Sequence, residues 1–311
     1  MITEFLVMAG ERPKRLDAFL VSHERGISRS RLQRLIVAGR IRVNAHVTKP
    51  GQKIKPGDRI TMDSPEPGPV MADNRVVPLE ILYEDEALLV VNKSAGVVVH
   101  PTSGNWNGTL LNGLLAYFQS TGRGQANGEP GLVHRLDKET SGVMVVAKTE
   151  EAHRALCTQF EKHVITRTYE ALVHGRPIHD HGTIDVAIGR DSTEGKKVSI
   201  HTRNPEVAIT EFTVIQQFGE KASRVELIPR TGRQHQLRVH LASLGSPIIG
   251  DPIYSTQEVN HLSKFTIPRM MLHATCIGFQ HPMTKKNQAY TAEFPSDMQR
   301  TLQDLQKECS R

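Results

Sequence analysis

Cysteine and aromatic residues are scarce in this chain, and each shortage excludes a class of structure. The 311 residues include three cysteines, Cys157, Cys276 and Cys309, none of them in a Cys-x-x-Cys pair. This distribution excludes a disulfide framework and the usual zinc spacings, and it fits a reducing compartment. Aromatic residues make up 5% of the chain, so a broad platform for stacking many bases is not expected.

Long apolar runs are missing as well. No stretch approaches the roughly 20 residues that a membrane-spanning helix needs, and residues 1–7 are too short and too acidic for a signal peptide. We therefore expect a cytoplasmic protein without a membrane partner. The hydrophobic content of 38% and the length are typical of a globular chain with one large and one small domain.

Positive charge is in excess, and much of the excess lies near the N-terminus. The net charge is +6, which favours a polyanionic partner. Residues 25–60 contain ten Lys and Arg residues but only one acidic residue, Asp58. The residues before this basic segment predict a helix with Leu16, Phe19 and Leu20 on one face, and a second helix is predicted to begin at the N-cap Ser28.

This order of features resembles the S-four-type RNA-binding domain, also called the αL motif. The resemblance covers residues 14–62 and depends on residues 28–36 (SRSRLQRLI), residues 39–44 (GRIRVN) and residues 55–58 (KPGD). It implies that basic side chains contact RNA phosphates and help to place the substrate, without supplying chemistry. The expected RNA-binding residues of this domain are Arg29, Arg31, Arg34 and Arg40.

A proline-rich segment separates this domain from the rest. Residues 64–69 (SPEPGP) have a proline at every second position, which excludes a helix or a central strand. We place a linker at residues 64–78, between an RNA-binding domain at residues 1–63 and a catalytic domain at residues 79–298. Residues 299–311 are assigned to a C-terminal tail.

From residue 79 onwards the pattern is mixed α and β. Thr109 and Thr149 are expected N-caps of two amphipathic helices, and Gly232 is expected to turn the chain into a third. Residues 190–206 predict an exposed hairpin whose basic residues can meet a phosphate backbone. The predicted strands lie at residues 87–91, 143–148, 166–175 and 224–228.

One carboxylate, Asp137, lies between Arg135 and Lys138 in residues 131–142 (GLVHRLDKETSG), directly before the predicted strand at residues 143–148. A carboxylate near fixed positive charge stays ionised and can act as a nucleophile or a base. Spacing alone favours a structural ion pair, because such pairs also occur at strand starts. His153 and Cys157 have a spacing that could hold a metal, but no further ligands lie nearby, and no metal site is expected.

Four stretches in order resemble the RluA-type pseudouridine synthases. They are residues 96–101 (GVVVHP), 134–142 (HRLDKETSG), 167–173 (RTYEALV) and 232–240 (GRQHQLRVH). The resemblance spans residues 80–295, and the S-four-type domain narrows it to the branch similar to RluC and RluD. The chain departs from the family pattern in Ser94 for a common proline, in Gln234 for a usual threonine, and in Pro205-Glu206 for a frequent Gly-Lys.

This resemblance implies that uridine in RNA is isomerised to pseudouridine without a cofactor. Asp137 would act at the ribose, either by adding to C1′ or by removing the C2′ proton. Arg233 would pair with Asp137 and keep it ionised, and Tyr169 would stack on the base and line the step in which C5 loses its proton. Arg135 would fill the gap left by the flipped nucleotide, and Lys138 would contact RNA.

The implied fold is α+β, with a small αL-type domain followed by a mixed, mainly antiparallel sheet and flanking helices. The expected substrate is large-subunit (23S) ribosomal RNA, free or in a pre-ribosomal particle, bound by a monomer. Two alternatives stay open, which are the same chemistry on transfer RNA and a non-catalytic ribosome-assembly protein that binds RNA. A glycoside or nucleoside hydrolase would need a second acid flanking the bond, and Glu139 is only two residues from Asp137.

Overall fold

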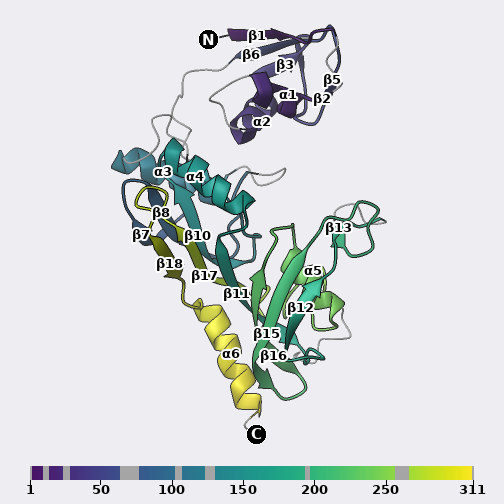
Figure 1. Cartoon of the computed structure of the whole chain (residues 1–311), viewed down its shortest axis with the longest axis vertical. Helices are drawn as coiled ribbons and strands as arrows, with labels where there is room; N and C mark the ends of the chain where they lie inside the picture. Colours follow the sequence, from purple (N-terminus) through teal and green to yellow (C-terminus); the bar gives the residue numbers. More distant parts are fainter. Residues whose placement is uncertain are drawn as a thin grey trace. The chain divides into compact units, whose positions relative to one another are not determined.

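The computed structural model describes residues 2–9, 14–23, 29–63, 77–101, 107–122, 130–192, 197–255 and 266–309. Within it the chain divides into two compact units, Met1–Val70 and Met71–Arg311 (Figure 1). The predicted N-cap Ser28, the prolines of residues 64–69 and the side chains of Arg29, Arg31 and Arg34 lie outside the described residues. The division of the chain into the four segments given above remains a proposal.

The smaller unit combines two helices with short antiparallel strands. Its main sheet has the order β1-β6-β3-β4, and β2 pairs with β5. The predicted face of the first helix is confirmed, because Leu16, Phe19 and Leu20 are buried in one apolar cluster. Leu32 and Ile36 of the second helix are buried in the same cluster, and Leu35 is partly buried against it. The elements are β1 (Ile2–Leu6), β2 (Lys14–Arg15), α1 (Leu16–His23), α2 (Arg29–Val37), β3 (Ile41–Val43), β4 (His46–Val47), β5 (Lys53–Ile54) and β6 (Arg59–Asp63).

The larger unit is built on a ten-stranded sheet of order β12-β15-β16-β11-β17-β10-β8-β7, with β18 beside β17 and β9 beside β10. Its described strand pairs are antiparallel except β10 with β17, which confirms the mixed, mainly antiparallel sheet. The strands are β7 (Glu80–Glu84), β8 (Leu88–Lys93), β9 (Gly131–Leu132), β10 (Ser141–Ala147), β11 (Thr166–His174), β12 (His181–Asp185), β15 (Ile209–Phe218), β16 (Ala222–Pro229), β17 (Leu272–Gln280) and β18 (Asn287–Thr291). A separate two-stranded sheet pairs β13 (Gly189–Arg190) with β14 (Val198–Ser199).

Four helices accompany the sheet in the part that the structure describes. They are α3 (Leu110–Thr121), α4 (Glu150–Glu161), α5 (Gln236–Ser243) and α6 (Ser296–Cys309). Thr109 and Thr149 cap α3 and α4 through their hydroxyl groups, as predicted. In Figure 1, α3 and α4 lie at the end of the ten-stranded sheet where β7, β8 and β10 are found. Helices α5 and α6 contact β15.

Helix α6 extends through residues 299–309, which the sequence assigned to a tail. Met298, Thr301 and Leu305 of this helix are buried. Its first turn is tied to the core, because Asp297 accepts hydrogen bonds from Nε and Nη2 of Arg269 at 2.7 and 2.9 Å. None of the helices in the described ranges is both long and apolar enough to cross a bilayer.

Strand β10 is buried along its whole length and fixes the position of the loop that precedes it. It pairs antiparallel with β8 and, at its start, parallel with β17 through Ser141↔His273 and Gly142↔Ala274. Gly142 has φ +121°, and a Cβ there would lie 2.2 Å from the carbonyl oxygen of Ala274. Only glycine permits this backbone conformation and this close approach.

Gly142→Ala should therefore destabilise the larger unit by about 3 kcal/mol or more, because backbone strain and a steric clash combine. Denaturant unfolding of the full chain measures the loss. Gly245→Ala is the matched control, since Gly245 has φ +73° and a Cβ there would meet no described atom within 4 Å. The control should cost only about 1 kcal/mol. Equal losses for both variants would contradict the packing argument.

Candidate active site

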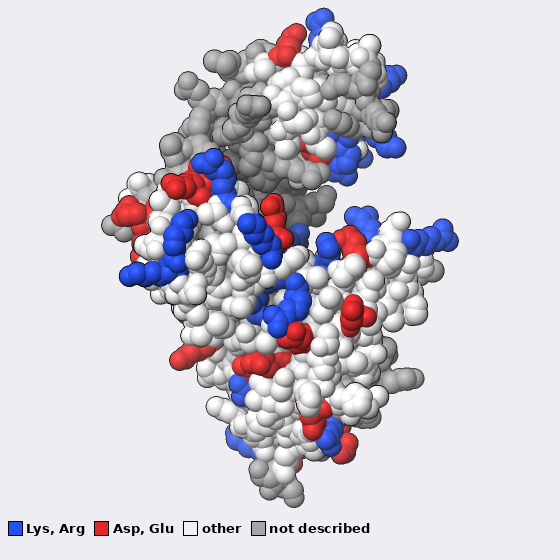
Figure 2. All heavy atoms as spheres, in the orientation of Figure 1, with Lys and Arg blue, Asp and Glu red and all other residues white. Residues whose placement is uncertain are grey.

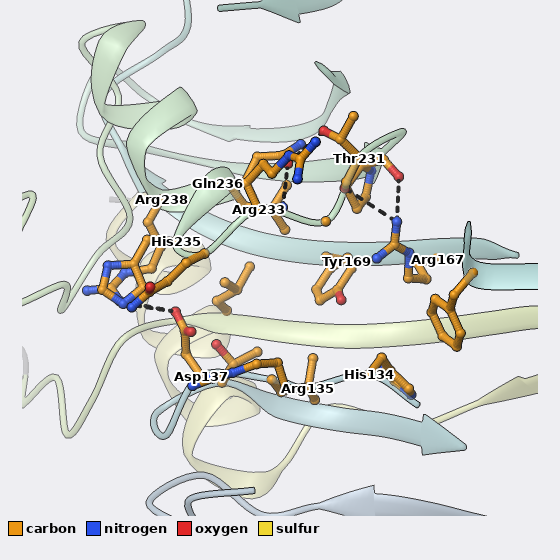
Figure 3. A pocket seen from close by; sticks show the side chains of 18 of the residues that line it. His134, Arg135, Asp137, Arg167, Tyr169, Thr231, Arg233, His235, Gln236 and Arg238 are labelled. Atoms are coloured by element: carbon orange, nitrogen blue, oxygen red, sulfur yellow. Dashed lines mark hydrogen bonds and ion pairs between the residues drawn. The ribbon is translucent and has the colours of Figure 1, made fainter. Parts of the chain in front are cut away.

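The active-site loop, residues 133–140, connects β9 to β10 and borders a cavity of about 560 Å³. The opposite wall comes from β11, which contributes Arg167 and Tyr169, and from the segment between β16 and α5. Figure 3 shows His134, Arg135 and Asp137 on the loop, with Tyr169 and Arg167 facing them from across the cavity. Segments distant in sequence thus converge on one pocket.

Asp137 lies at one end of this pocket, against the first turn of α5. Nη1 of Arg238 donates a hydrogen bond to its Oδ2 at 3.1 Å, and Nε2 of His235 lies 3.8 Å from the same oxygen. The Asp137 side chain is 23% exposed, whereas that of Arg238 is 7% exposed. Asp137 therefore has a charge-assisted hydrogen bond on one oxygen, and its residual exposure leaves the carboxyl group accessible to a substrate.

The predicted ion pair between Arg233 and Asp137 is wrong. Arg233 lines the pocket, but its Nη1 pairs with Oε2 of Glu206 at 2.7 Å, and its Nε donates to the carbonyl oxygen of Val207 at 3.1 Å. The Arg233 side chain is 43% exposed. Arg238 is the arginine that contacts Asp137.

The reason is the start of α5, which lies at Gln236 rather than just after Gly232. His235 turns the chain with φ 55°, and the side-chain oxygen of Gln236 accepts hydrogen bonds from the backbone N–H of Arg233 and from Oγ1 of Thr231. Arg233 is therefore held outside the helix (Figure 3), and Arg238 occupies the first helical turn. Arg238 directly follows Leu237 and lies off the face that Leu237 and Leu241 share, so the helical pattern gave no signal that Arg238 is buried.

His235 connects Asp137 to a second aromatic residue. Its Nδ1 lies 2.9 Å from Oη of Tyr254, and that hydroxyl also accepts the backbone N–H of Val198 at 3.2 Å. Burial lowers the pKa of His235, although Asp137 opposes the shift. The imidazole beside the carboxylate is therefore neutral at physiological pH, and Arg238 is the cation in contact with Asp137.

Tyr169 projects into the pocket from β11 at an irregularity of the sheet. The pairing of β11 with β17 shifts register between Thr168 and Tyr169, which marks a bulge. Bulges re-aim side chains next to functional sites. Burial raises the pKa of Tyr169, so the ring presents a neutral phenol to the cavity. The sequence placed Tyr169 on a strand, and the structure adds the bulge.

The other expected RNA-binding residues occupy different positions. Arg135 is exposed and lines the pocket, whereas Lys138 is exposed on the same loop without being one of the lining residues. Arg40, in the smaller unit, is 53% exposed, and its Nη1 lies 2.7 Å from Oδ2 of Asp63. The side chains of Arg29, Arg31 and Arg34 are not among those the structure describes.

Two buried basic side chains hold the active-site loop from behind, and the sequence identified neither. Nζ of Lys93 donates to the carbonyl oxygens of Ser94, Val97 and Lys138 at 2.9, 2.9 and 3.2 Å. Nη1 of Arg269 donates to the carbonyl oxygen of Glu139 at 3.1 Å. Burial lowers the pKa of Lys93 to about 7. The signal for Lys93 was a lysine at the end of an otherwise apolar strand.

His134 anchors the start of the same loop. Its Nε2 accepts the backbone N–H of Val145 on β10 at 3.1 Å, and its ring stacks on Phe160 with 5.0 Å between centroids. Burial, together with the nearby Arg167, lowers the pKa of His134 to about 3. The acceptor role and the lowered pKa agree, because a protonated Nε2 could not accept this hydrogen bond.

His153 and Cys157 lie close together on α4, with 3.6 Å between Nε2 and Sγ. No cluster of three or more His, Cys, Asp or Glu side chains in the described ranges is arranged to hold a metal ion.

Comparison with known proteins defines the class. A family model described as RNA pseudouridylate synthase matches residues 87–243, and an S4 domain model matches residues 14–60. The structure is similar to human RNA pseudouridylate synthase domain containing 4, with a TM-score of 0.59 and 26% identity over 73% of this chain and 93% of that chain. The chain belongs to the RNA pseudouridylate synthase family, whose members are isomerases.

Curated relatives extend this likeness to nearly the whole chain. It is 42% identical to the ribosomal large subunit pseudouridine synthase D of Zymomonas mobilis, over 92% of both chains. It is 40% identical to an RNA pseudouridine synthase of Bacillus subtilis, over 96% of both chains. Both the predicted family and the predicted N-terminal S4 domain are confirmed.

The lowered pKa of His134 predicts loss of stability in acid. Below pH 6.5 the unfolded chain binds a proton at this histidine, while the folded chain stays unprotonated until about pH 3. The free energy of unfolding should therefore fall from pH 6.5 towards pH 3, by up to about 1.4 kcal/mol per pH unit from this group. Denaturant titrations at a series of pH values measure the slope.

His134→Gln should remove this contribution while keeping an acceptor for the N–H of Val145. The matched control is His179→Gln, because His179 is exposed and the slope should stay as in the parent protein. If His134→Gln and His179→Gln gave the same acid slope, the buried neutral state of His134 would be refuted.

Proposed function

We propose that this protein isomerises specific uridines of ribosomal RNA to pseudouridine, with Asp137 as the reacting carboxylate. The observation that carries the proposal is the position of Asp137, partly exposed at the end of a nucleotide-sized cavity, against the guanidinium of Arg238 and across from Tyr169. Relatives named ribosomal large subunit pseudouridine synthase D, from Zymomonas mobilis and Pseudomonas aeruginosa, support the choice of RNA.

The chemistry exchanges one bond of the nucleotide for another. The C1′–N1 bond breaks, the base turns in the pocket, C5 bonds to C1′, C5 loses its proton and N1 gains one, so that atoms and electrons balance within the substrate. Both contacts of the Asp137 carboxylate within the described part of the chain use Oδ2. Oδ1 is left to add to C1′ or to remove the C2′ proton.

The other pocket residues have roles that follow from their placement. The neutral phenol of Tyr169 supplies a flat, apolar wall on which the released base stacks while it turns, and it lines the C5 proton-transfer step. Arg135 is exposed at the rim and fills the space that the flipped nucleotide leaves. Arg233, paired with an exposed glutamate at the rim, is assigned to the RNA backbone rather than to Asp137.

RNA binding draws on basic residues in each unit. In the smaller unit the S4 domain supplies Arg29, Arg31, Arg34 and Arg40. In the larger unit Arg190, Lys197 and Arg203 belong to the lobe around β13 and β14, and Figure 2 shows Lys and Arg side chains there. A ribosomal substrate also implies a cytoplasmic location. The enzyme is further proposed to act as a monomer.

Asp137→Asn should abolish pseudouridine formation, by about a thousandfold or more, and leave RNA affinity within about threefold. The substrate is a 23S ribosomal RNA transcript labelled with tritium at C5, since isomerisation releases that hydrogen. Glu139→Gln and Glu161→Gln are the matched controls, because they neutralise acids on the same loop and pocket wall. Both controls should keep activity.

Two outcomes would overturn this proposal. Release of free uracil, with a requirement for a second acid, would indicate a hydrolase, and full function in Asp137→Asn would indicate a non-catalytic assembly factor. Chemical mapping of pseudouridine in cells that lack the protein identifies the target. Sites lost from transfer RNA alone would replace the ribosomal substrate by the transfer RNA alternative.

Replacing Arg29, Arg31 and Arg34 together by Gln should weaken RNA binding and lower its salt dependence. The slope of log Kobs against log salt should fall by roughly two to three, because each phosphate contact contributes close to one. The matched control replaces the exposed Lys221, Arg300 and Lys307 by Gln, which removes the same charge elsewhere. An equal change in slope for both triple variants would show that only net charge matters.

A further inference from the structure

One buried guanidinium is shared by two carboxylates in the active site. Nε and Nη2 of Arg238 donate to Oδ2 and Oδ1 of Asp251 at 2.7 and 2.9 Å, and Nη1 donates to Oδ2 of Asp137 at 3.1 Å. The Asp251 side chain is fully buried. Arg238 therefore binds Asp251 in a bidentate manner, through Nε and Nη2, and gives Asp137 a single hydrogen bond.

Asp251 is itself held rigidly. Its Oδ1 accepts the backbone N–H groups of Ile253 and Tyr254 at 2.9 and 3.1 Å. The preceding Gly250 has φ +77°, and a Cβ there would lie 2.1 Å from the carbonyl oxygen of Arg269. The ring of Tyr254 lies under the guanidinium of Arg238, 4.9 Å from centroid to Cζ. Asp251 cannot shift without breaking these contacts.

We propose that Asp251 is a positioning residue for the isomerisation, which orients Arg238 so that one oxygen of Asp137 stays available to the ribose. A bidentate arginine–carboxylate pair is the stronger arrangement. An Arg238 that was free to turn would offer its bidentate edge to Asp137 and occupy both carboxylate oxygens. The inference rests on the proposed role of Asp137.

Replacement by asparagine tests this geometry with little change of shape. In Asp251→Asn the retained Oδ1 can still accept from Ile253, Tyr254 and Nη2 of Arg238. The new NH2 group meets Nε–H of Arg238 donor to donor, so the guanidinium is expected to turn. The kcat should fall roughly 10- to 100-fold, as for other residues that orient a functional side chain, with KM within about threefold.

The pH profile gives a readout that a purely structural role would not move. The charged and titratable groups around the two carboxylates are Arg238, His235, Tyr254, Tyr169, Lys93 and Arg135. With Asp251 neutralised, the whole charge of Arg238 acts on Asp137 and stabilises its ionised form. The acidic limb of kcat should therefore move to lower pH in Asp251→Asn.

A double-mutant cycle with Arg238→Lys shows whether Asp251 acts through Arg238. Residues that act through one another give non-additive effects. Asp251→Asn should change the kcat of the Arg238→Lys enzyme by no more than about threefold. Glu170→Gln is the matched control, because it breaks a partly buried pair with Arg224 on β11 and β16 and should leave kcat, KM and the pH profile as in the parent enzyme.

The possible results separate cleanly. If the parent enzyme forms no pseudouridine, the proposed function fails before this inference is tested. If the parent is active and Asp251→Asn slows both backgrounds by the same factor, the positioning role is refuted. An unchanged kcat per folded molecule, with folding measured by thermal unfolding and circular dichroism, refutes it as well.

Discussion

The guanidinium of Arg238 is the group on which the arrangement of this site depends. A buried charge is stable only when its hydrogen-bond donors have partners, and Arg238 has them in Asp251 and Asp137. These two residues belong to the segment after α5 and to the loop before β10, so one side chain joins three parts of the chain. Removing either carboxylate would leave the guanidinium incompletely paired, and this couples the local fold to the chemistry.

The same means of fixation recurs behind the active-site loop. Lys93 at the end of β8 and Arg269 before β17 donate to backbone carbonyl oxygens of the loop. Because Arg269 also pairs with Asp297 in the first turn of α6, the C-terminal helix takes part in holding the loop. The proposed role of Asp137 needs a position fixed to within about 0.5 Å, and these basic side chains hold the backbone of the loop without lining the cavity.

Local signals were sufficient to predict three of the described helices of the larger unit and the central strands β8, β10, β11 and β16. The caps Thr109 and Thr149 and the buried strand β10 were predicted correctly. Asp137, Arg135 and Tyr169 line one pocket, and their roles stay a prediction. The start of α5 was not predicted correctly, because it depends on the left-handed conformation of His235 and on the side chain of Gln236. The partners of Arg238 could not be predicted, since Asp137 lies 101 residues away and no local pattern pairs them.

The proposed reaction uses one carboxylate and leaves its substrate with the same atoms, and the protonation states of the groups around Asp137 bear on that proposal. Burial raises the pKa of Tyr169 and lowers the pKa of His235, so these two neighbours of Asp137 are neutral at neutral pH. In the proposed reaction the uracil ring turns against the neutral rings of Tyr169 and His235, while Arg135, Arg167 and Arg233 line the same pocket. The bond must re-form through C5 after this rotation, so the pocket has to retain the base while binding it loosely. A stacked ring and a rim arginine meet both conditions.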